Sequence, residues 1–99
     1  MYTKEELDEK VKRYIKIYRL YYLNFPARPD EELFWQPDGD NKIELISNLE
    51  TSHIENCIRR VKKDLKDFDD KHTKDIIVPL MENKLKHLKA ELTDRINRL

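Results

Sequence analysis

The segment LFWQPDGDNKIELISNLETSHIENCIRRVKKD, residues 33–64, carries most of the information about the fold. It contains the only tryptophan, the only glycine and the only cysteine of the chain, which are Trp35, Gly39 and Cys57. It also combines a turn, an alternating apolar pattern and the start of a helix. The segments on either side have the spacing of ordinary amphipathic helices, so we expect the functional residues in or beside this segment.

The first half of the segment predicts a small β-hairpin over about residues 33–46. Residues 33–36 have the composition of a short strand, and residues 42–45 alternate polar and apolar as a half-buried strand does. Between them, Pro37 presets φ and Gly39 accepts a positive φ, which favours a tight turn. Because an isolated hairpin is marginally stable in water, we expect it to pack on helices.

A first helix is predicted before the hairpin, over about residues 4–23. Thr3 and Glu6 have the spacing of a capping box, and Pro26 ends the helical region. Apolar residues recur at intervals of three and four, as on one face of an α-helix. They are Leu7, Val11, Tyr14, Ile15, Tyr18 and Tyr22.

Two further helices are predicted after the hairpin, over about residues 48–69 and 75–98. Ser47 with Glu50 and Ser52 with Glu55 are alternative capping boxes for the first of them. Its buried face is expected to hold Leu49, Ile54, Cys57, Ile58, Val61, Leu65 and Phe68. The last helix tolerates Pro79 near its start and carries an almost heptad seam of Met81, Leu85, Leu88, Leu92, Ile96 and Leu99. The seam fits either the core of one chain or a contact with another chain.

Composition supports a mainly α fold of three amphipathic helices with a small β-hairpin between the first two. The 99 residues are 38% hydrophobic and 40% charged, with one glycine, and this length favours a single domain over residues 1–99. A core of this size is modest, so self-association is expected. The formal net charge is zero, which disfavours nucleic acid as a partner.

The cysteine count and the hydropathy of the chain bear on its compartment. A single cysteine cannot form an intramolecular disulfide, which suits a reducing compartment. No apolar run approaches the roughly 18 residues that a membrane span needs, and the first residues have no secretory pattern. We therefore expect a cytoplasmic protein without a membrane partner.

The residues offer little support for catalysis. His53 and Cys57 lie one helical turn apart, but a structural zinc site needs four nitrogen or sulfur ligands. A nucleophilic Cys57 would need a base and an orienting acid, and it falls on the expected buried face. A glycine-rich phosphate loop is absent, because Gly39 stands alone. We predict no enzyme activity, no metal and no cofactor.

Several residues suit ligand binding, each with a plainer alternative. The first helix interleaves cations with tyrosines, including Tyr22, which suits phosphates and bases but also a core stripe with exposed lysine ends. A basic cluster on the second helix, either a solvated face or, beside Trp35, a phosphate clamp, consists of Arg59, Arg60, Lys62 and Lys63. Trp35 beside the turn is either a lid over the core or a stacking surface for a base.

The order of these residues also resembles a known pattern. Trp35, Asp38-Gly39, Ile43, Leu45, Leu49 and His53-Ile54 with Asn56 resemble the arrangement W…DG…I-x-[IL]…[LM]-x-x-x-H-[LI]-x-N of small proteins from tailed bacteriophages. The resemblance covers residues 35–58, about a quarter of the chain. A subset of such proteins is similar to the viral anti-CBASS sponge family, whose members sequester cyclic dinucleotide immune signals.

The resemblance implies a non-enzymatic homo-oligomer, tetrameric in that family, that acts in the host cytoplasm and binds a ligand such as 3′3′-cGAMP. A cyclic dinucleotide has two-fold symmetry, so a symmetric protein interface matches it. The candidate ligand contacts are Trp35, Asp38, His53, Asn56, Arg59, Arg60 and Tyr22. His53 is open to a second role, a hydrogen bond at the helix start. The pattern stops before Arg59 and Arg60, so their role is an extension of it.

A function of another class is compatible with the same sequence. The tyrosine-rich first helix or the seam of the last helix would suit a small phage protein that binds a host protein through its helical faces.

Overall fold

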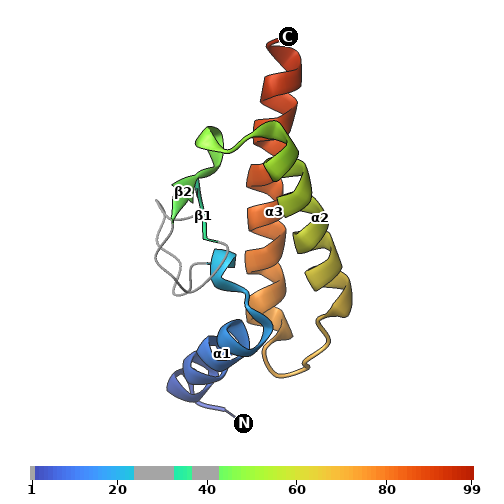
Figure 1. The fold of residues 1–99 in the computed structure, drawn as a ribbon. Helices are drawn as coiled ribbons and strands as arrows, with labels where there is room; N and C mark the ends of the chain where they lie inside the picture. Colours follow the sequence, from blue (N-terminus) through green and yellow to red (C-terminus); the bar gives the residue numbers. More distant parts are fainter. Residues whose placement is uncertain (1, 24–32, 37–42) are drawn as a thin grey trace.

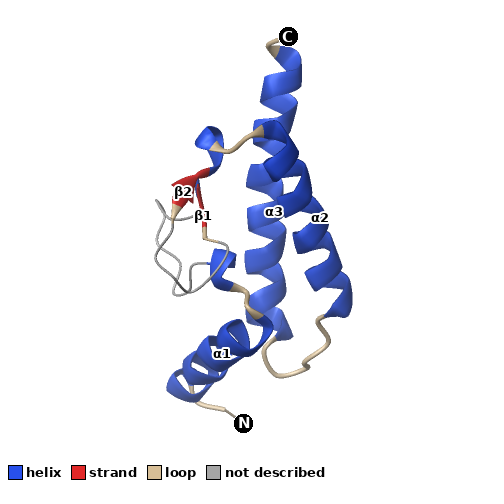
Figure 2. Ribbon diagram, in the orientation of Figure 1, coloured by secondary structure: helices blue, strands red, loops and turns tan. Residues whose placement is uncertain are grey.

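The structure of the chain is a computed structural model that describes residues 2–23, 33–36 and 43–99. The fold is mainly α, as predicted: three helices, with a small antiparallel hairpin between the first and the second (Figures 1 and 2). The helices are α1 (Lys4–Tyr18), α2 (Thr51–Asp67) and α3 (Lys74–Asn97). The hairpin pairs β1 (Phe34–Trp35) with β2 (Glu44–Leu45), in the register Phe34 to Leu45 and Trp35 to Glu44.

Helix α3 is the central element. Helix α2 packs along it, and the hairpin lies on its other side, while α1 crosses near its N-terminal end (Figure 1). The described chain measures 51 × 26 × 21 Å and has a radius of gyration of 14.0 Å. A compact domain of this length has a radius of gyration of about 13 Å. The fold is therefore somewhat elongated, and the C-terminal end of α3 projects beyond α2 (Figure 1).

The first helix is shorter than the predicted span of 4–23. Its N-terminus is as expected, because the Glu6 amide donates to the Thr3 hydroxyl at 3.2 Å. The helix ends at Tyr18 because Arg19 takes the left-handed conformation (φ 56°, ψ 45°). The chain then turns, and the 3₁₀ helix η1 (Tyr21–Leu23) carries Tyr22 and Leu23 into the core.

The second helix begins at Thr51, preceded by the 3₁₀ turn η3 (Ile46–Asn48). Neither predicted serine cap forms, since the N-cap position is Glu50 and its side chain makes no capping hydrogen bond. The predicted buried face is confirmed: Leu49, Ile54, Cys57, Ile58, Val61 and Phe68 are buried, and Leu65 is half-buried.

The seam of the last helix is divided between core and surface. Met81 and Leu88 are fully buried against α2 and the hairpin side, and Leu85 and Leu92 pack against the same core. Ile96 remains 59% exposed at the projecting end. The first part of the seam is therefore used within the chain. Pro79 lies in the second turn of α3.

Lysine 84 joins the hairpin to α3. Its side chain is almost fully buried, and its ammonium donates to the carbonyl of Phe34 at 2.6 Å. Spacing does not predict that this lysine is buried, because a lysine on a helix is normally expected to be exposed. It fixes β1 against the middle of α3.

Candidate functional site

Two of the predicted ligand contacts, Trp35 and Tyr22, face each other in the core. Their rings are nearly parallel, with an interplanar angle of 4° and 4.8 Å between centroids. Trp35 is 2% exposed and Tyr22 is 0% exposed. The expectation that these rings present a stacking face to a ligand is corrected here: burial against η1 and β1 covers them. The plainer alternative, a lid over the core, describes Trp35.

Arg60, a predicted ligand contact, and Asp64 of α2 complete what we call the Tyr22 cluster, which consists of Tyr22, Trp35, Arg60 and Asp64. The Tyr22 hydroxyl donates to Asp64 at 2.6 Å, and the Arg60 guanidinium lies 5.3 Å from the Tyr22 ring centroid. Arg60 also lies 3.8 Å from Asp64 and donates to the carbonyl of Arg19. Burial, followed by the hydrogen bond to Asp64, raises the pKa of Tyr22 far above its ordinary value.

The Tyr22 cluster has a structural consequence for the shape of the chain. Arg60 supports the carbonyl of Arg19, the residue whose left-handed backbone ends α1. A left-handed conformation costs a non-glycine residue about 1–2 kcal/mol. The tertiary contact from α2 offsets part of this cost. Arg60 therefore holds the turn between α1 and η1, and its side chain remains 34% exposed.

The remaining predicted contacts lie on the outside of α2. His53, Asn56, Arg59 and Lys63 are exposed and are spaced three, three and four residues apart, so they follow one side of the helix; we call this set the α2 polar face. Arg59 donates to the amide oxygen of Asn56. The predicted site is thus divided into a buried aromatic part and an exposed polar part. Asp38 lies outside the described residues.

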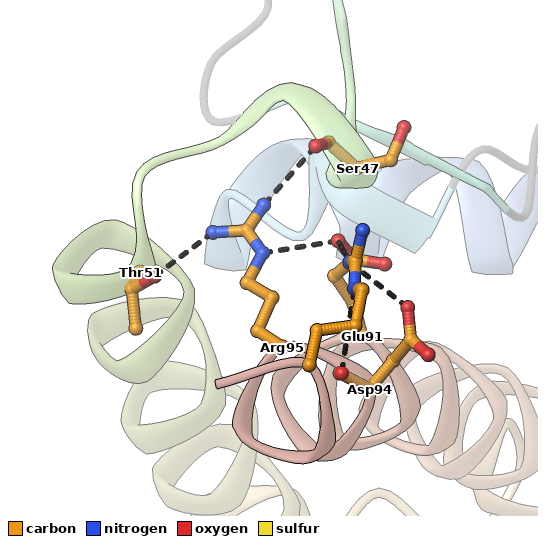
Figure 3. A network of polar contacts seen from close by, with 6 residues as sticks. Ser47, Thr51, Glu91, Asp94 and Arg95 are labelled. Carbon is orange, nitrogen blue, oxygen red and sulfur yellow. Dashed lines mark hydrogen bonds and ion pairs between the residues drawn. The ribbon is translucent and has the colours of Figure 1, made fainter.

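A polar network that the sequence did not indicate joins α3 to the start of α2 (Figure 3). Arg95 donates to the carbonyl of Ser47 at 3.1 Å and to the hydroxyl of Thr51 at 3.1 Å. It is oriented by Glu91, whose carboxylate accepts from the Arg95 Nε at 3.0 Å. This contact ties the segment before α2 to α3, but it does not cap α2, because the guanidinium donates and the first-turn amides of a helix need an acceptor. The only local signal was the Glu91–Arg95 spacing of four residues.

A second polar junction holds α1 against the connection between α2 and α3. Asp70 accepts hydrogen bonds from the Tyr14 hydroxyl at 2.9 Å and from the Thr73 amide and hydroxyl at 3.0 and 2.8 Å. Burial alone would raise the pKa of Asp70, but the hydrogen bonds from Thr73 and Tyr14 outweigh it and lower that pKa. The same contact raises the pKa of Tyr14. The junction is structural, since Tyr14 and Asp70 satisfy each other.

Cysteine 57 has the environment of a core residue. It is buried, and burial raises the pKa of its thiol to about 11. A thiol is the weaker nucleophile compared with its thiolate, so this environment suppresses its reactivity at neutral pH. Over residues 2–23, 33–36 and 43–99, no three His, Cys, Asp or Glu side chains are grouped so as to hold a metal ion. Within the same ranges no helix is long and apolar enough to cross a membrane.

Comparison with known proteins adds no family to this geometry. No protein-family model, no curated protein and no solved structure matches the chain. The fold and site described above therefore define the class to which the molecule can be assigned, a small three-helix protein with a hairpin lid and an exposed polar helix face. The resemblance to phage proteins rests on the residues quoted for it.

Proposed function

We propose that the chain is a non-enzymatic, oligomeric binding protein of phage origin, which sequesters a cyclic dinucleotide such as 3′3′-cGAMP in the host cytoplasm. The observation that carries the proposal is the α2 polar face, where Asn56, Arg59 and Lys63 are exposed side by side on a well-packed helix. The residue pattern from Trp35 to Asn56 supplies the link to cyclic dinucleotides.

The chemistry of the α2 polar face suits half of such a ligand. The Asn56 amide offers both a donor and an acceptor to a base edge, and the Arg59 guanidinium offers a planar pair of donors. Lys63 adds a point charge one turn further along, at a distance suited to a phosphate. The contact between Arg59 and Asn56 orients both groups before a ligand arrives.

The proposal assigns Tyr22 and Trp35 a supporting role. Because both rings are covered, we assign neither a stacking contact with the ligand: Tyr22 contacts α2 through Asp64 and Arg60, and Trp35 packs on Tyr22. A half-site built from one helix face binds a two-fold ligand weakly unless a second copy supplies the other half. Oligomers, including the tetramer of the family that the chain resembles, would provide that second half.

Isothermal titration with 3′3′-cGAMP and a panel of other cyclic dinucleotides tests the proposal. We expect exothermic binding at one ligand per two chains, with affinity lowered at least about tenfold by Arg59→Ala or Asn56→Ala, which is about 1.4 kcal/mol. Lys71→Ala, an exposed cation on the α2–α3 connection, is the matched control and should leave the affinity unchanged. Absence of heat across the whole panel would contradict the proposal.

A second candidate function is favoured by a different observation. Ile17 and Tyr18, at the end of α1, are 61% and 55% exposed, although apolar side chains of this size usually bury. They suit a small interaction protein that binds a host protein. A pull-down from host lysate separates the two functions: a sponge recovers nucleotide, whereas an interaction protein recovers a stoichiometric protein that Ile17→Asp releases.

A further inference from the structure

One exposed row of side chains on α3 has a charge order that is complementary to itself. Four-residue steps along the helix define the Ala90 row, which consists of Glu82, Lys86, Ala90, Asp94 and Arg98; all five are exposed. Arg98 caps the helix but keeps a helical backbone (φ −88°, ψ −6°), so the row continues to it. From one end to the other the charges are negative, positive, neutral, negative, positive.

This order reads the same after reversal and exchange of sign. If a second copy of α3 crosses in the antiparallel direction with Ala90 at the crossing point, Lys86 meets Asp94 of the other copy. Glu82 and Arg98 lie eight residues from the crossing point and about 80° around the helix from Ala90, so they stand at the edge of the contact. A two-fold axis makes every such contact occur twice. In the parallel direction each charge would meet its own kind, which is unfavourable. From the charge order, we infer that α3 pairs with a second copy of this chain, antiparallel, about Ala90.

The shape of the surface beside the row fits a second helix. The row is part of an open, shallow face of α3 that also includes Leu85, Lys89 and Thr93. A groove of about 290 Å³ lies beside it, between Ala90 and residues Leu33 and Leu45 at the hairpin. Rows of four-residue steps on two helices pack into such grooves at a crossing angle of about −50°.

The residue at the crossing point permits close approach. Alanine at position 90 has the smallest side chain of the row, so the two helix axes can approach within the about 8–10 Å that is usual for packed helices. The contact would also cover Leu33, which is 51% exposed, and Leu45. These two leucines form an apolar edge of the hairpin that nothing in the described chain covers completely.

Pairing within one chain does not account for the whole row. Arg98 lies 2.9 Å from Asp94 and 3.7 Å from Glu91, but the Arg98 and Asp94 side chains are 63% and 61% exposed. Exposed pairs of this kind contribute at most about 1 kcal/mol. The Asp94 charge remains able to engage a second copy, and in the pair it would gain Lys86 of the other copy as a partner.

Charge exchange between chains tests the inference. In sedimentation equilibrium the wild type should form a dimer of the 12.1 kDa chain, or a tetramer built from such dimers. Lys86→Glu and Asp94→Lys should each weaken the pair about tenfold or more, because each creates two like-charge contacts. The double variant K86E/D94K should restore it, since the reversed charges still meet their opposites in the antiparallel direction.

Three further samples sharpen the test. A mixture of the two single variants should form a heterodimer, detectable by native mass spectrometry. Ala90→Arg should dissociate the pair, because it sets bulk and like charge on the two-fold axis. Lys62→Glu on α2, an exposed charge away from the row, is the matched control and should associate as the wild type does. Circular dichroism melts verify that each variant folds.

The outcomes that overturn the inference are specific. A wild type that stays a monomer removes it, and also removes the oligomer on which the proposed function depends. If the oligomer is unaffected by charge reversal, or if K86E/D94K does not restore it, the chain associates through another surface and only the assignment to the Ala90 row is refuted. The inference shares with the proposed function only the claim that the chain forms an oligomer. A charge-sensitive dimer that binds no cyclic dinucleotide would therefore support the α3 pair and contradict the proposed function.

Discussion

The indole ring of Trp35 and the phenol ring of Tyr22 lie parallel at 4.8 Å, and this contact joins the hairpin to the segment that follows α1. The two residues are separated by a part of the chain that includes the undescribed residues 24–32, so the contact is tertiary. It directs the most conspicuous residue of the sequence inward. The Tyr22 hydroxyl then extends the contact to Asp64 of α2.

Removal of the Trp35 ring should be severely destabilising. We expect Trp35→Ala to lower the free energy of unfolding by about 3–5 kcal/mol, because it leaves a cavity beside Tyr22 and β1. This is a large part of the about 5–15 kcal/mol that stabilises a typical domain. Urea unfolding followed by circular dichroism measures the loss. Leu33→Ala, at a half-exposed neighbour, is the control, and a Trp35→Ala variant as stable as that control would refute the buried position.

Loss of the Arg95 side chain should loosen the start of α2. Arg95→Ala removes hydrogen bonds to the Ser47 carbonyl and the Thr51 hydroxyl together with the contact to Glu91. We expect a loss of about 1–2 kcal/mol in the free energy of unfolding and faster amide exchange over residues 46–54. Lys12→Ala, which breaks an exposed ion pair with Glu9 at 3.8 Å, should change neither quantity appreciably. Equal exchange rates in the two variants would show that Arg95 does not hold this segment.

Stability in acid should depend on Asp70. Its pKa is lower in the folded chain than its ordinary value, because hydrogen bonds from Thr73 and Tyr14 outweigh burial. The folded state therefore binds the proton less readily than the unfolded state does. Its contribution to stability is complete above the unfolded-state pKa of about 3.9 and is lost as the pH falls through the folded-state pKa.

The matching experiment compares unfolding of the wild type and Asp70→Asn in urea over the acid range. The variant should be less stable near neutral pH, and its stability should decline less steeply as the pH falls. Asp69→Asn, at the exposed neighbouring position, should retain the slope of the wild type. Parallel curves for wild type and Asp70→Asn would show that the junction does not couple to pH.

The Cys57 thiol should be protected in the folded state. Burial raises its pKa to about 11, against about 8.5 for a free cysteine. We expect a thiol reagent at pH 8 to react slowly with the native chain and rapidly after denaturation. A raised pKa contributes stability below the unfolded-state value, and this contribution is lost as the pH rises from about 8.5 toward 11. Rapid reaction of the native chain would contradict the burial of Cys57.

The helices were predictable because their evidence is local. Apolar residues three and four positions apart predicted α2 and its buried face from Ile54 to Phe68, and the Thr3–Glu6 capping box predicted where α1 begins. A hairpin over about residues 33–46 was also predicted, and the pairing of Phe34–Trp35 with Glu44–Leu45 confirms it, although β2 is exposed where a half-buried strand was expected and the predicted turn at Pro37 and Gly39 lies outside the described residues. These features depend on neighbours within a few residues, which a sequence displays directly.

The candidate site was only partly predictable. The sequence predicted Asn56 and Arg59 as candidate ligand contacts, and they contact each other on α2. It did not predict that Arg60, the next residue, turns to the Tyr22 ring and the Arg19 carbonyl. Adjacent positions on a helix differ in direction by about 100°, so the packing of η1 against α2 decides which arginine is exposed.

The sequence by itself determined the elements: three amphipathic helices, a hairpin between the first two, and the apolar faces that meet. The tertiary structure alone decided where α1 ends, since the left-handed Arg19 is held by an arginine from α2. It also decided that Trp35 is covered and that Arg95 ties the segment before α2 to α3. The physical reason is the separation of the partners along the chain. Periodicity and caps reflect interactions within about one turn of helix. The partners of Arg19 and Arg95 lie about forty or more residues away, and Trp35 and Tyr22 lie on either side of a connection, so only packing brings them together.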